Sequence, residues 1–127
     1  MGIFSDGLKQ QIASNKSKIN QYEADLGRYQ QAVKDARTAK DMFEKSASNM
    51  DSMVQETAGV FQGSAATKFV SNLMTYNKTI WTMVDVMEKK IKSFEKRISE
   101  IEGQKAWCNA WNAVLTGLME TLKAIGF

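Results

Sequence analysis

The chain has 127 residues, of which 43% are hydrophobic and 24% charged, so it is long enough for one domain with a modest core and too apolar to be disordered. Its 17 basic and 14 acidic side chains give a net charge of +3. The two signs are intermixed along the chain, which argues against a nucleic-acid-binding face. Histidine is absent and Cys108 is the single cysteine, which excludes Ser-His and Cys-His nucleophile pairs, most metal sites and an intramolecular disulfide. We therefore expect no enzyme, no cofactor and no nucleic-acid partner.

The first residues, MGIFSDGLKQQ, lack the apolar core of a signal peptide. The sequence also contains no run of roughly 18 uncharged apolar residues, the length that spans a membrane. We expect a chain without stable membrane insertion that is cytoplasmic after synthesis. Any transfer to the cell surface or medium would then proceed without a cleavable signal peptide.

Proline is absent, and apolar residues recur every three or four positions through the first half, which predicts one helix over about 4–57. Asn15 and Lys40 are the polar exceptions in this repeat, and Gly27 is an unfavourable residue within it. The repeat consists of Leu8, Ile12, Ile19, Tyr22, Leu26, Tyr29, Val33, Ala36, Phe43, Ala47, Met50 and Val54.

Residues 58–63 contain two glycines and predict a turn. Gly59 suits a left-handed helix C-cap, and Gly63 is a second permissive position before Ser64, whose hydroxyl suits an N-cap. Pairing outward from this turn sets Thr57 opposite Ser64 and Phe4 near Gly117.

The second half resumes the repeat and predicts a helix over about 64–102. The step of eleven residues from Ile80 to Ile91 indicates a four-residue insertion in the heptad pattern. After Ile101 the apolar stripe changes phase at Gly103, so residues 104–125 either continue this helix or fold back as a third one. The repeat consists of Ala66, Phe69, Leu73, Tyr76, Ile80, Val84, Met87, Ile91, Phe94, Ile98 and Ile101.

These elements predict an all-α fold in which residues 1–127 form a single helical-hairpin domain. Two long helices joined by a short turn cannot bury their apolar stripes separately, so we expect them to pack as an antiparallel, coiled-coil-like hairpin.

The tail KAWCNAWNAVLTGLMETLKAIGF carries an apolar face wider than the narrow stripe that a two-helix contact needs. Tryptophan and methionine are enriched at protein interfaces. The face is therefore a candidate partner interface, with the alternative that it fills the protein's own core. Its members are Trp107, Trp111, Val114, Leu115, Leu118, Met119, Leu122 and Ile125.

The turn stretch GVFQGSAATKF resembles the Trp-Xaa-Gly motif of the WXG superfamily of bacterial type VII secretion. Phe61 stands at the tryptophan position and Gly63 at the glycine, followed by Ala65, Ala66 and Phe69. Because it has phenylalanine in place of this tryptophan, the chain resembles the small helical partners encoded beside LXG-domain toxins in Gram-positive bacteria.

This resemblance implies a non-enzymatic targeting factor that binds the helical N-terminal domain of an LXG-type toxin, or another small WXG-like protein, and contacts the secretion machinery. Export signals of this family place an acidic residue four positions after an aromatic one, and Trp81 with Asp85 is the candidate pair here. A packed tryptophan beside a surface acid is the alternative. Two other functions stay open: a self-dimerising WXG-like substrate, and a structural coiled-coil component unrelated to secretion.

Overall fold

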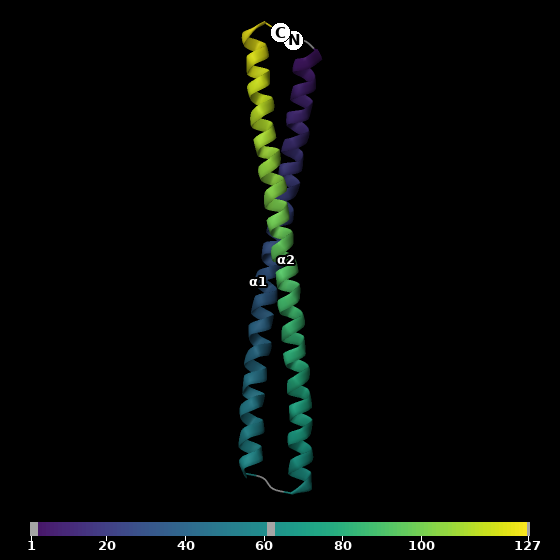
Figure 1. Cartoon of the computed structure of the whole chain (residues 1–127), viewed down its shortest axis with the longest axis vertical. Helices are drawn as coiled ribbons and strands as arrows, with labels where there is room; N and C mark the ends of the chain where they lie inside the picture. Colours follow the sequence, from purple (N-terminus) through teal and green to yellow (C-terminus); the bar gives the residue numbers. More distant parts are fainter. Residues whose placement is uncertain (1–2, 61–62, 127) are drawn as a thin grey trace. The chain divides into compact units, whose positions relative to one another are not determined.

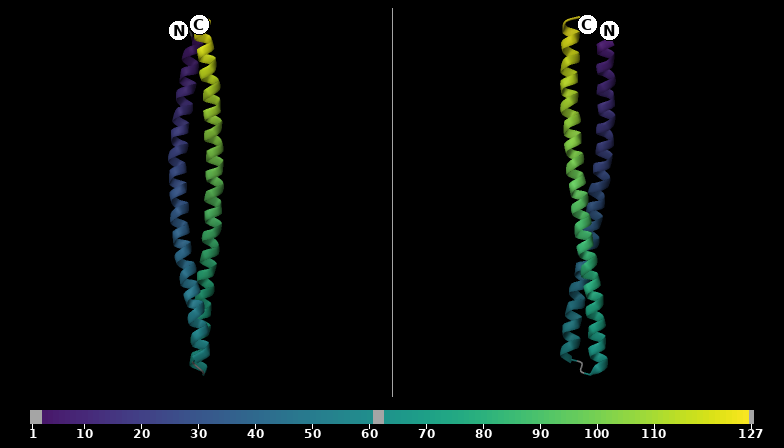
Figure 2. Two further views of the ribbon diagram at one scale, coloured as in Figure 1. Left: turned by 90° about the vertical axis from the view of Figure 1, so that its left-hand side faces the viewer. Right: turned by 45° about the vertical axis from the view of Figure 1, so that its right-hand side comes forward.

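The computed structural model describes residues 3–60 and 63–126, and it confirms the all-α helical hairpin. Helix α1 runs from Ile3–Val60 and helix α2 from Ser64–Ala124, and the described residues form no strand (Figure 1). The chain divides into two compact units. Unit 1 comprises Met1–Gln31 with Glu95–Phe127, and unit 2 comprises Ala32–Phe94. Within each unit, the α1 and α2 segments lie side by side and run antiparallel (Figure 2).

Unit 1 is held together by a seam of side chains that recur every three or four residues on both helices. Ile101 is fully buried in this seam, and the polar Asn15 is only 3% exposed. We call these positions the core seam, because a stripe at this spacing keeps facing its partner helix. Its members are Ser5, Leu8, Ile12, Asn15, Ile19, Tyr22, Leu26 and Tyr29 of α1 and Ile98, Ile101, Lys105, Cys108, Asn112, Leu115, Met119 and Leu122 of α2.

Unit 2 has a core seam with the same spacing, in which Ala47 and Ile91 are fully buried. Polar residues enter this seam at Lys40 and Asn77. Its members are Val33, Ala36, Lys40, Phe43, Ala47, Met50, Val54 and Thr57 of α1 and Ala66, Val70, Leu73, Asn77, Ile80, Val84, Met87, Ile91 and Phe94 of α2.

The structure corrects two core assignments in α2. Phe69 and Tyr76 were expected in the seam, but they are 51% and 66% exposed, and the seam passes through Val70 and Asn77 instead. Asn77 then lies seven residues before Val84, so the expected four-residue insertion is wrong and the heptad spacing is unbroken. The polar Asn77 hides this spacing in the sequence.

Helix α2 continues through Gly103, so residues 104–124 belong to it and do not fold back as a third helix. The apparent change of phase after Ile101 has a different cause. The core seam goes on through Lys105, Cys108 and Asn112, while the tryptophans lie beside it. Lys105 and Asn112 are polar and are therefore not recognised as core residues by hydrophobicity.

The turn lies later in the chain than expected. Gly59 is still helical and Gly63 has the positive backbone angle, with φ of 113°. Because Ser64 is already helical, Gly63 is the N-cap, and its carbonyl accepts the Thr67 N–H at 3.0 Å. The cross-helix register shifts accordingly: the expected pairing puts Val70 opposite Asp51, whereas Asn77 contacts Asp51 in unit 2.

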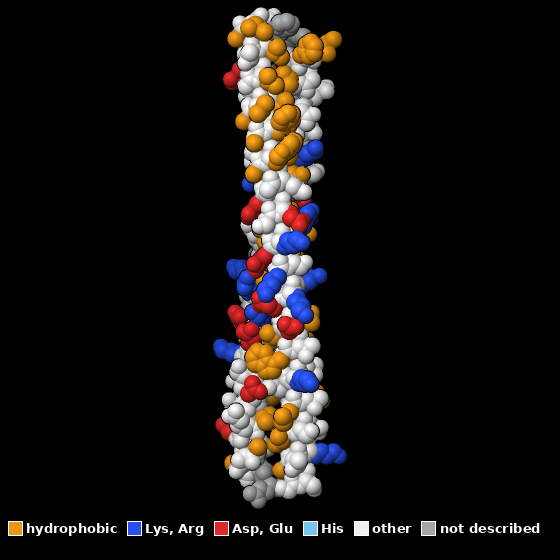
Figure 3. All heavy atoms as spheres, in the orientation of Figure 1, with side chains coloured by type: hydrophobic (Ala, Val, Ile, Leu, Met, Phe, Trp, Pro, Cys, Tyr) orange, Lys and Arg blue, Asp and Glu red, His pale blue; other side chains and the backbone are white. Residues whose placement is uncertain are grey.

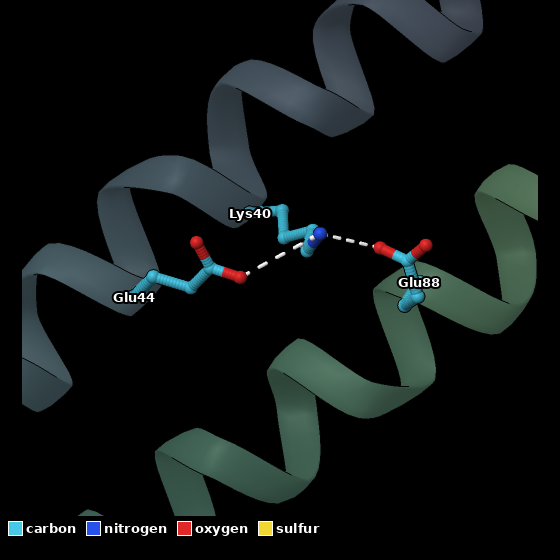
Figure 4. A network of polar contacts seen from close by, with 3 residues as sticks. All are labelled: Lys40, Glu44 and Glu88. Atoms are coloured by element: carbon cyan, nitrogen blue, oxygen red, sulfur yellow. Dashed lines mark ion pairs between the residues drawn. The ribbon is translucent and has the colours of Figure 1, made fainter.

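Polar contacts cross between the helices at the core seams of both units. In unit 1, Asn15 Nδ2 donates to Asn112 Oδ1 at 2.8 Å, and Asn112 Nδ2 donates to the Ile12 carbonyl at 3.4 Å. In unit 2, Lys40 forms ion pairs with Glu88 across the seam and with Glu44 on its own helix (Figure 4). Its hydrogen bond with Glu88 raises the pKa of Lys40 and lowers the pKa of Glu88.

Candidate partner-binding face

A second stripe of side chains runs along the C-terminal part of α2, directly beside the core seam of unit 1. Each member except Ile125 directly precedes a core-seam residue, and Ile125 continues the same seven-residue repeat beyond the last one. We call it the second seam. It consists of Gln104, Trp107, Trp111, Val114, Leu118, Thr121 and Ile125.

The apolar members of the second seam are exposed within unit 1. Trp107 is 65% exposed and Trp111 42%, and their rings stack with centroids 5.8 Å apart. Val114 and Leu118 are each 50% exposed and Ile125 63%. Because large apolar side chains that gather on one face of a protein commonly mark an interaction site, this stripe is the leading candidate for a functional surface.

Helix α1 adds two residues that the sequence analysis missed. Ile3 and Phe4 are 89% and 72% exposed, and with Leu118 and Thr121 they line an almost wholly apolar groove at the terminal end of unit 1. Figure 3 shows hydrophobic side chains gathered lengthwise along this part of the molecule. We refer to Ile3 and Phe4 together with Trp107, Trp111, Val114, Leu118 and Ile125 as the apolar face. In the sequence, Ile3 and Phe4 could have been found as two large apolar residues directly before Ser5, the first core-seam position.

The other side of the core seam in unit 1 is polar. The positions that directly follow a core-seam residue there are all exposed, and none of them has a large apolar side chain. Four are alanine or glycine, and the others carry charges, amides or hydroxyls. The polar ones are Asp6, Lys9, Lys16, Asn20, Glu23 and Gln30 of α1 and Ser99, Glu102, Asn109, Thr116, Glu120 and Lys123 of α2. The apolar face therefore lies on only one side of the core seam, as expected if a partner binds unit 1 from that side.

The eight residues predicted as an interface divide between two roles. Leu115 is only 5% exposed and packs in the core seam, where Met119 and Leu122 are half-buried. These three residues face α1 and hold unit 1 together. The other five form the exposed part of the second seam, so the predicted wide face is two adjacent seams.

The turn motif is only partly described by the structure. Phe61 lies outside the described residues. Gly63 adopts its positive φ, Ala66 is half-buried in the core seam of unit 2, and Ala65 and Phe69 are exposed. The motif residues in the described part of the chain therefore include two exposed side chains next to the start of α2.

Trp81 and Asp85, the candidate export signal, lie one turn apart on α2 in unit 2. Trp81 is 40% exposed and lines a groove with Met74, Asp51 and other residues. The Asp85 carboxylate lies 3.3 Å from Lys89 Nζ in an exposed ion pair. Trp81 is thus not a fully packed core residue, and both side chains are accessible to a binding partner.

Residues 3–60 and 63–126 were compared with the requirements of a metal site and of a membrane-spanning helix. Within these ranges no three His, Cys, Asp or Glu residues lie close enough together to hold a metal ion. Neither helix, over the same residues, has a segment that is long and apolar enough to cross a membrane.

Comparisons of the chain with protein-family models, with characterised proteins and with solved structures find no match. The geometry of the apolar face is therefore the principal basis for assigning a function.

Proposed function

We propose that this protein is a non-enzymatic helical partner whose apolar face binds helices of another polypeptide. The observation that carries the proposal is the second seam: five large apolar side chains at heptad spacing, exposed beside a core seam that α1 already covers. A stripe with this spacing is complemented by another α-helix, because only a helix presents side chains with the same repeat.

The resemblance of the turn motif to WXG proteins supports a specific partner. Under this proposal the partner is the helical N-terminal domain of an LXG-type toxin, and the complex is delivered to a type VII secretion system. Gly63 at the turn and the exposed Phe69, six residues later on α2, are compatible with that motif. Trp81 and Asp85 remain the candidate export signal in this scheme.

The experiment measures the affinity of the purified protein for the helical domain of an LXG-type toxin encoded beside it, by calorimetry and by light scattering of the complex. Trp107→Gln removes the most exposed ring of the second seam. We expect it to weaken binding roughly 30-fold, because loss of an interface hot spot, a class enriched in tryptophan, costs about 2 kcal/mol or more.

Tyr76→Gln is the matched control. Tyr76 is an aromatic residue of α2 with nearly the same exposure, 66% against 65% for Trp107, but it lies in unit 2. It should leave the affinity unchanged. Absence of binding by the unmodified protein, or equal losses for the two variants, would contradict the proposal.

A further inference from the structure

The geometry of α2 indicates how many helices an occupant of the apolar face supplies. The second seam is the core seam displaced by one residue, and one residue of a helix with 3.5 residues per turn is a rotation of about 100°. The two contact directions of α2 are thus separated by about the 90° corner of a four-helix bundle rather than the roughly 60° corner of a three-helix one. The occupant therefore supplies a helical hairpin, as this chain itself does.

The sizes of the second-seam residues are complementary to those of a second copy in the antiparallel direction. The large rings of Trp107 and Trp111 lie toward one end of the stripe, and the smaller Leu118 and Thr121 lie toward the other. If two α2 helices cross antiparallel with Val114 at the twofold axis, Trp111 lies opposite Leu118 and Trp107 opposite Thr121. Large side chains then face smaller ones in each layer, which is the arrangement that packs without voids.

The groove at the terminal end of unit 1 can accommodate the indole rings of Trp107 and Trp111 of the second copy. Phe4, Leu118 and Leu122 line it, and in the antiparallel register the indoles of a second copy lie over it. The Thr121 hydroxyl donates to the Gly117 carbonyl at 2.9 Å, which leaves the hydroxyl oxygen as an acceptor for an indole N–H. A tryptophan buried in an interface usually needs such an acceptor. A parallel dimer would instead set groove against groove and ring against ring.

Small residues border the second seam on its outer side. The positions that precede second-seam residues by one include Gly103, Ala110, Gly117 and Ala124, at intervals of seven. In the antiparallel register Ala110 of one copy faces Gly117 of the other, so that no long side chain separates the two helices.

Charge and area are also suited to a second copy. Residues 106–119 contain no charged side chain, so the axis region brings no like charges together. From the exposed fractions of its members, the apolar face offers on the order of 800 Å², which is about what each partner buries in a stable protein interface.

We propose that a second copy of this chain covers the apolar face in the absence of another partner, with the two α2 helices antiparallel and Val114 at the twofold axis. The inference rests on the apolar face being an interface, as the proposed function does, but it does not require the toxin. A second copy and the helices of another protein then compete for one surface.

The first test places like charges at the proposed axis. Light scattering of the unmodified protein should give twice 14.3 kDa at micromolar concentration. Val114→Glu and Val114→Lys should each be monomeric, since each sets two identical charges face to face, and an equimolar mixture of the two should dimerise again. Val86→Glu in unit 2, where Val86 is 59% exposed, is the matched control and should remain dimeric. A monomeric unmodified protein, a dimeric Val114→Glu variant or a monomeric mixture would each overturn the proposal.

The second test determines the direction of the helices. In the antiparallel register residue 104 faces residue 125 of the other copy. A mixture of Gln104→Cys and Ile125→Cys proteins, one of them size-tagged, should form a mixed disulfide on mild oxidation, while neither variant alone should cross-link. The unmodified protein controls for the buried Cys108. Cross-linking of Gln104→Cys to itself would indicate a parallel pair and overturn the proposal.

Adding the toxin domain separates the two proposals. If the protein is a monomer alone and binds the toxin domain, the dimer is wrong and the proposed function survives. If the dimer forms but the toxin domain does not bind, the proposed function is wrong and the dimer survives. Conversion of the dimer into a mixed complex, prevented in both cases by a charge at position 114, would support both.

Discussion

At the scale of single residues, polar side chains in the core seams determine how α1 and α2 align. Asn15 is nearly buried, and it both accepts from Gln11 Nε2 at 3.2 Å and donates to Asn112. An apolar seam tolerates displacement by a whole heptad, whereas a buried amide pair loses its partner when the register changes. These contacts therefore contribute more to the choice of register than to stability.

Asn15→Ala should lower the free energy of unfolding by about 1–3 kcal/mol, because the Asn112 amide then loses a buried partner. Urea denaturation followed by circular dichroism measures this loss. Asn20→Ala, at an exposed position of the same helix, is the control and should have little effect. The double variant Asn15→Leu/Asn112→Leu should recover most of the loss; a double variant as unstable as Asn15→Ala would show that the amides do not act as a pair.

The ion pair between Lys40 and Glu88 gives the stability of the protein a pH dependence. The pKa of Glu88 is lowered mainly by its hydrogen bond with Lys40, so the contribution of Glu88 is present above its ordinary pKa of 4.5 and is lost as the pH falls through the lowered value. The pKa of Lys40 is raised mainly by the same bond, so its contribution is complete below 10.5 and is lost as the pH rises through the raised value.

Lys40→Met removes the group that lowers the pKa of Glu88. This variant should lose less stability than the unmodified protein between pH 7 and pH 3, as measured by urea denaturation at the two pH values. Lys89→Met is the matched control: it breaks an ion pair with Asp85 in which both side chains are mostly exposed, and such pairs contribute little. An acid response of Lys40→Met identical to that of the unmodified protein would rule out this role of the ion pair.

At the scale of the elements, the two helices were predictable because the heptad repeat persists for most of the chain and proline is absent. The repeat located α1 almost to its ends. It misassigned α2 where hydrophobicity and burial diverge: Phe69 and Tyr76 are apolar and exposed, whereas Asn77 is polar and buried.

The same divergence explains why the predicted interface combined buried and exposed residues. Two seams displaced by one residue form a single wide apolar face in the sequence, and only the position of α1 reveals that Leu115 faces inward and Trp107 outward. Lys105 and Asn112, core-seam residues with polar ends, had no sequence signal for burial. Helix α1 ends later than predicted because Gly59, although a favourable C-cap residue, stays helical at a cost of only about 1 kcal/mol relative to alanine.

Gly27 and Gly63 should respond to replacement by alanine in opposite ways. Gly27 lies inside α1 with nothing within 4 Å of an added Cβ, so Gly27→Ala should raise the free energy of unfolding by about 0.5–1 kcal/mol. Gly63 has a φ of 113°, which alanine adopts only with strain, so Gly63→Ala should lower it. Thermal unfolding measures both. Stabilisation by Gly63→Ala would show that its positive φ is not required.

At the scale of the whole molecule, the two units differ in how their exposed apolar residues are distributed. In unit 1 they gather on one side of the core seam, opposite a side rich in charges. In unit 2, Met74 and Trp81 lie on one side of the seam, and Phe69, Tyr76 and Met83 lie on the other. A single continuous partner surface is therefore a property of unit 1, while unit 2 offers separate smaller contacts, including the candidate export signal.

The position of Cys108 gives this molecule an internal reporter of its own opening. Its thiol is 6% exposed in the core seam of unit 1, and the sequence holds no other. A thiol-specific reagent can modify it only while the two helices of that unit are apart, so the labelling rate measures the frequency of local separation without any introduced probe. A ligand that clamps unit 1 slows this reaction and one that binds elsewhere leaves it unchanged, which makes a single native atom sufficient to locate where a ligand acts.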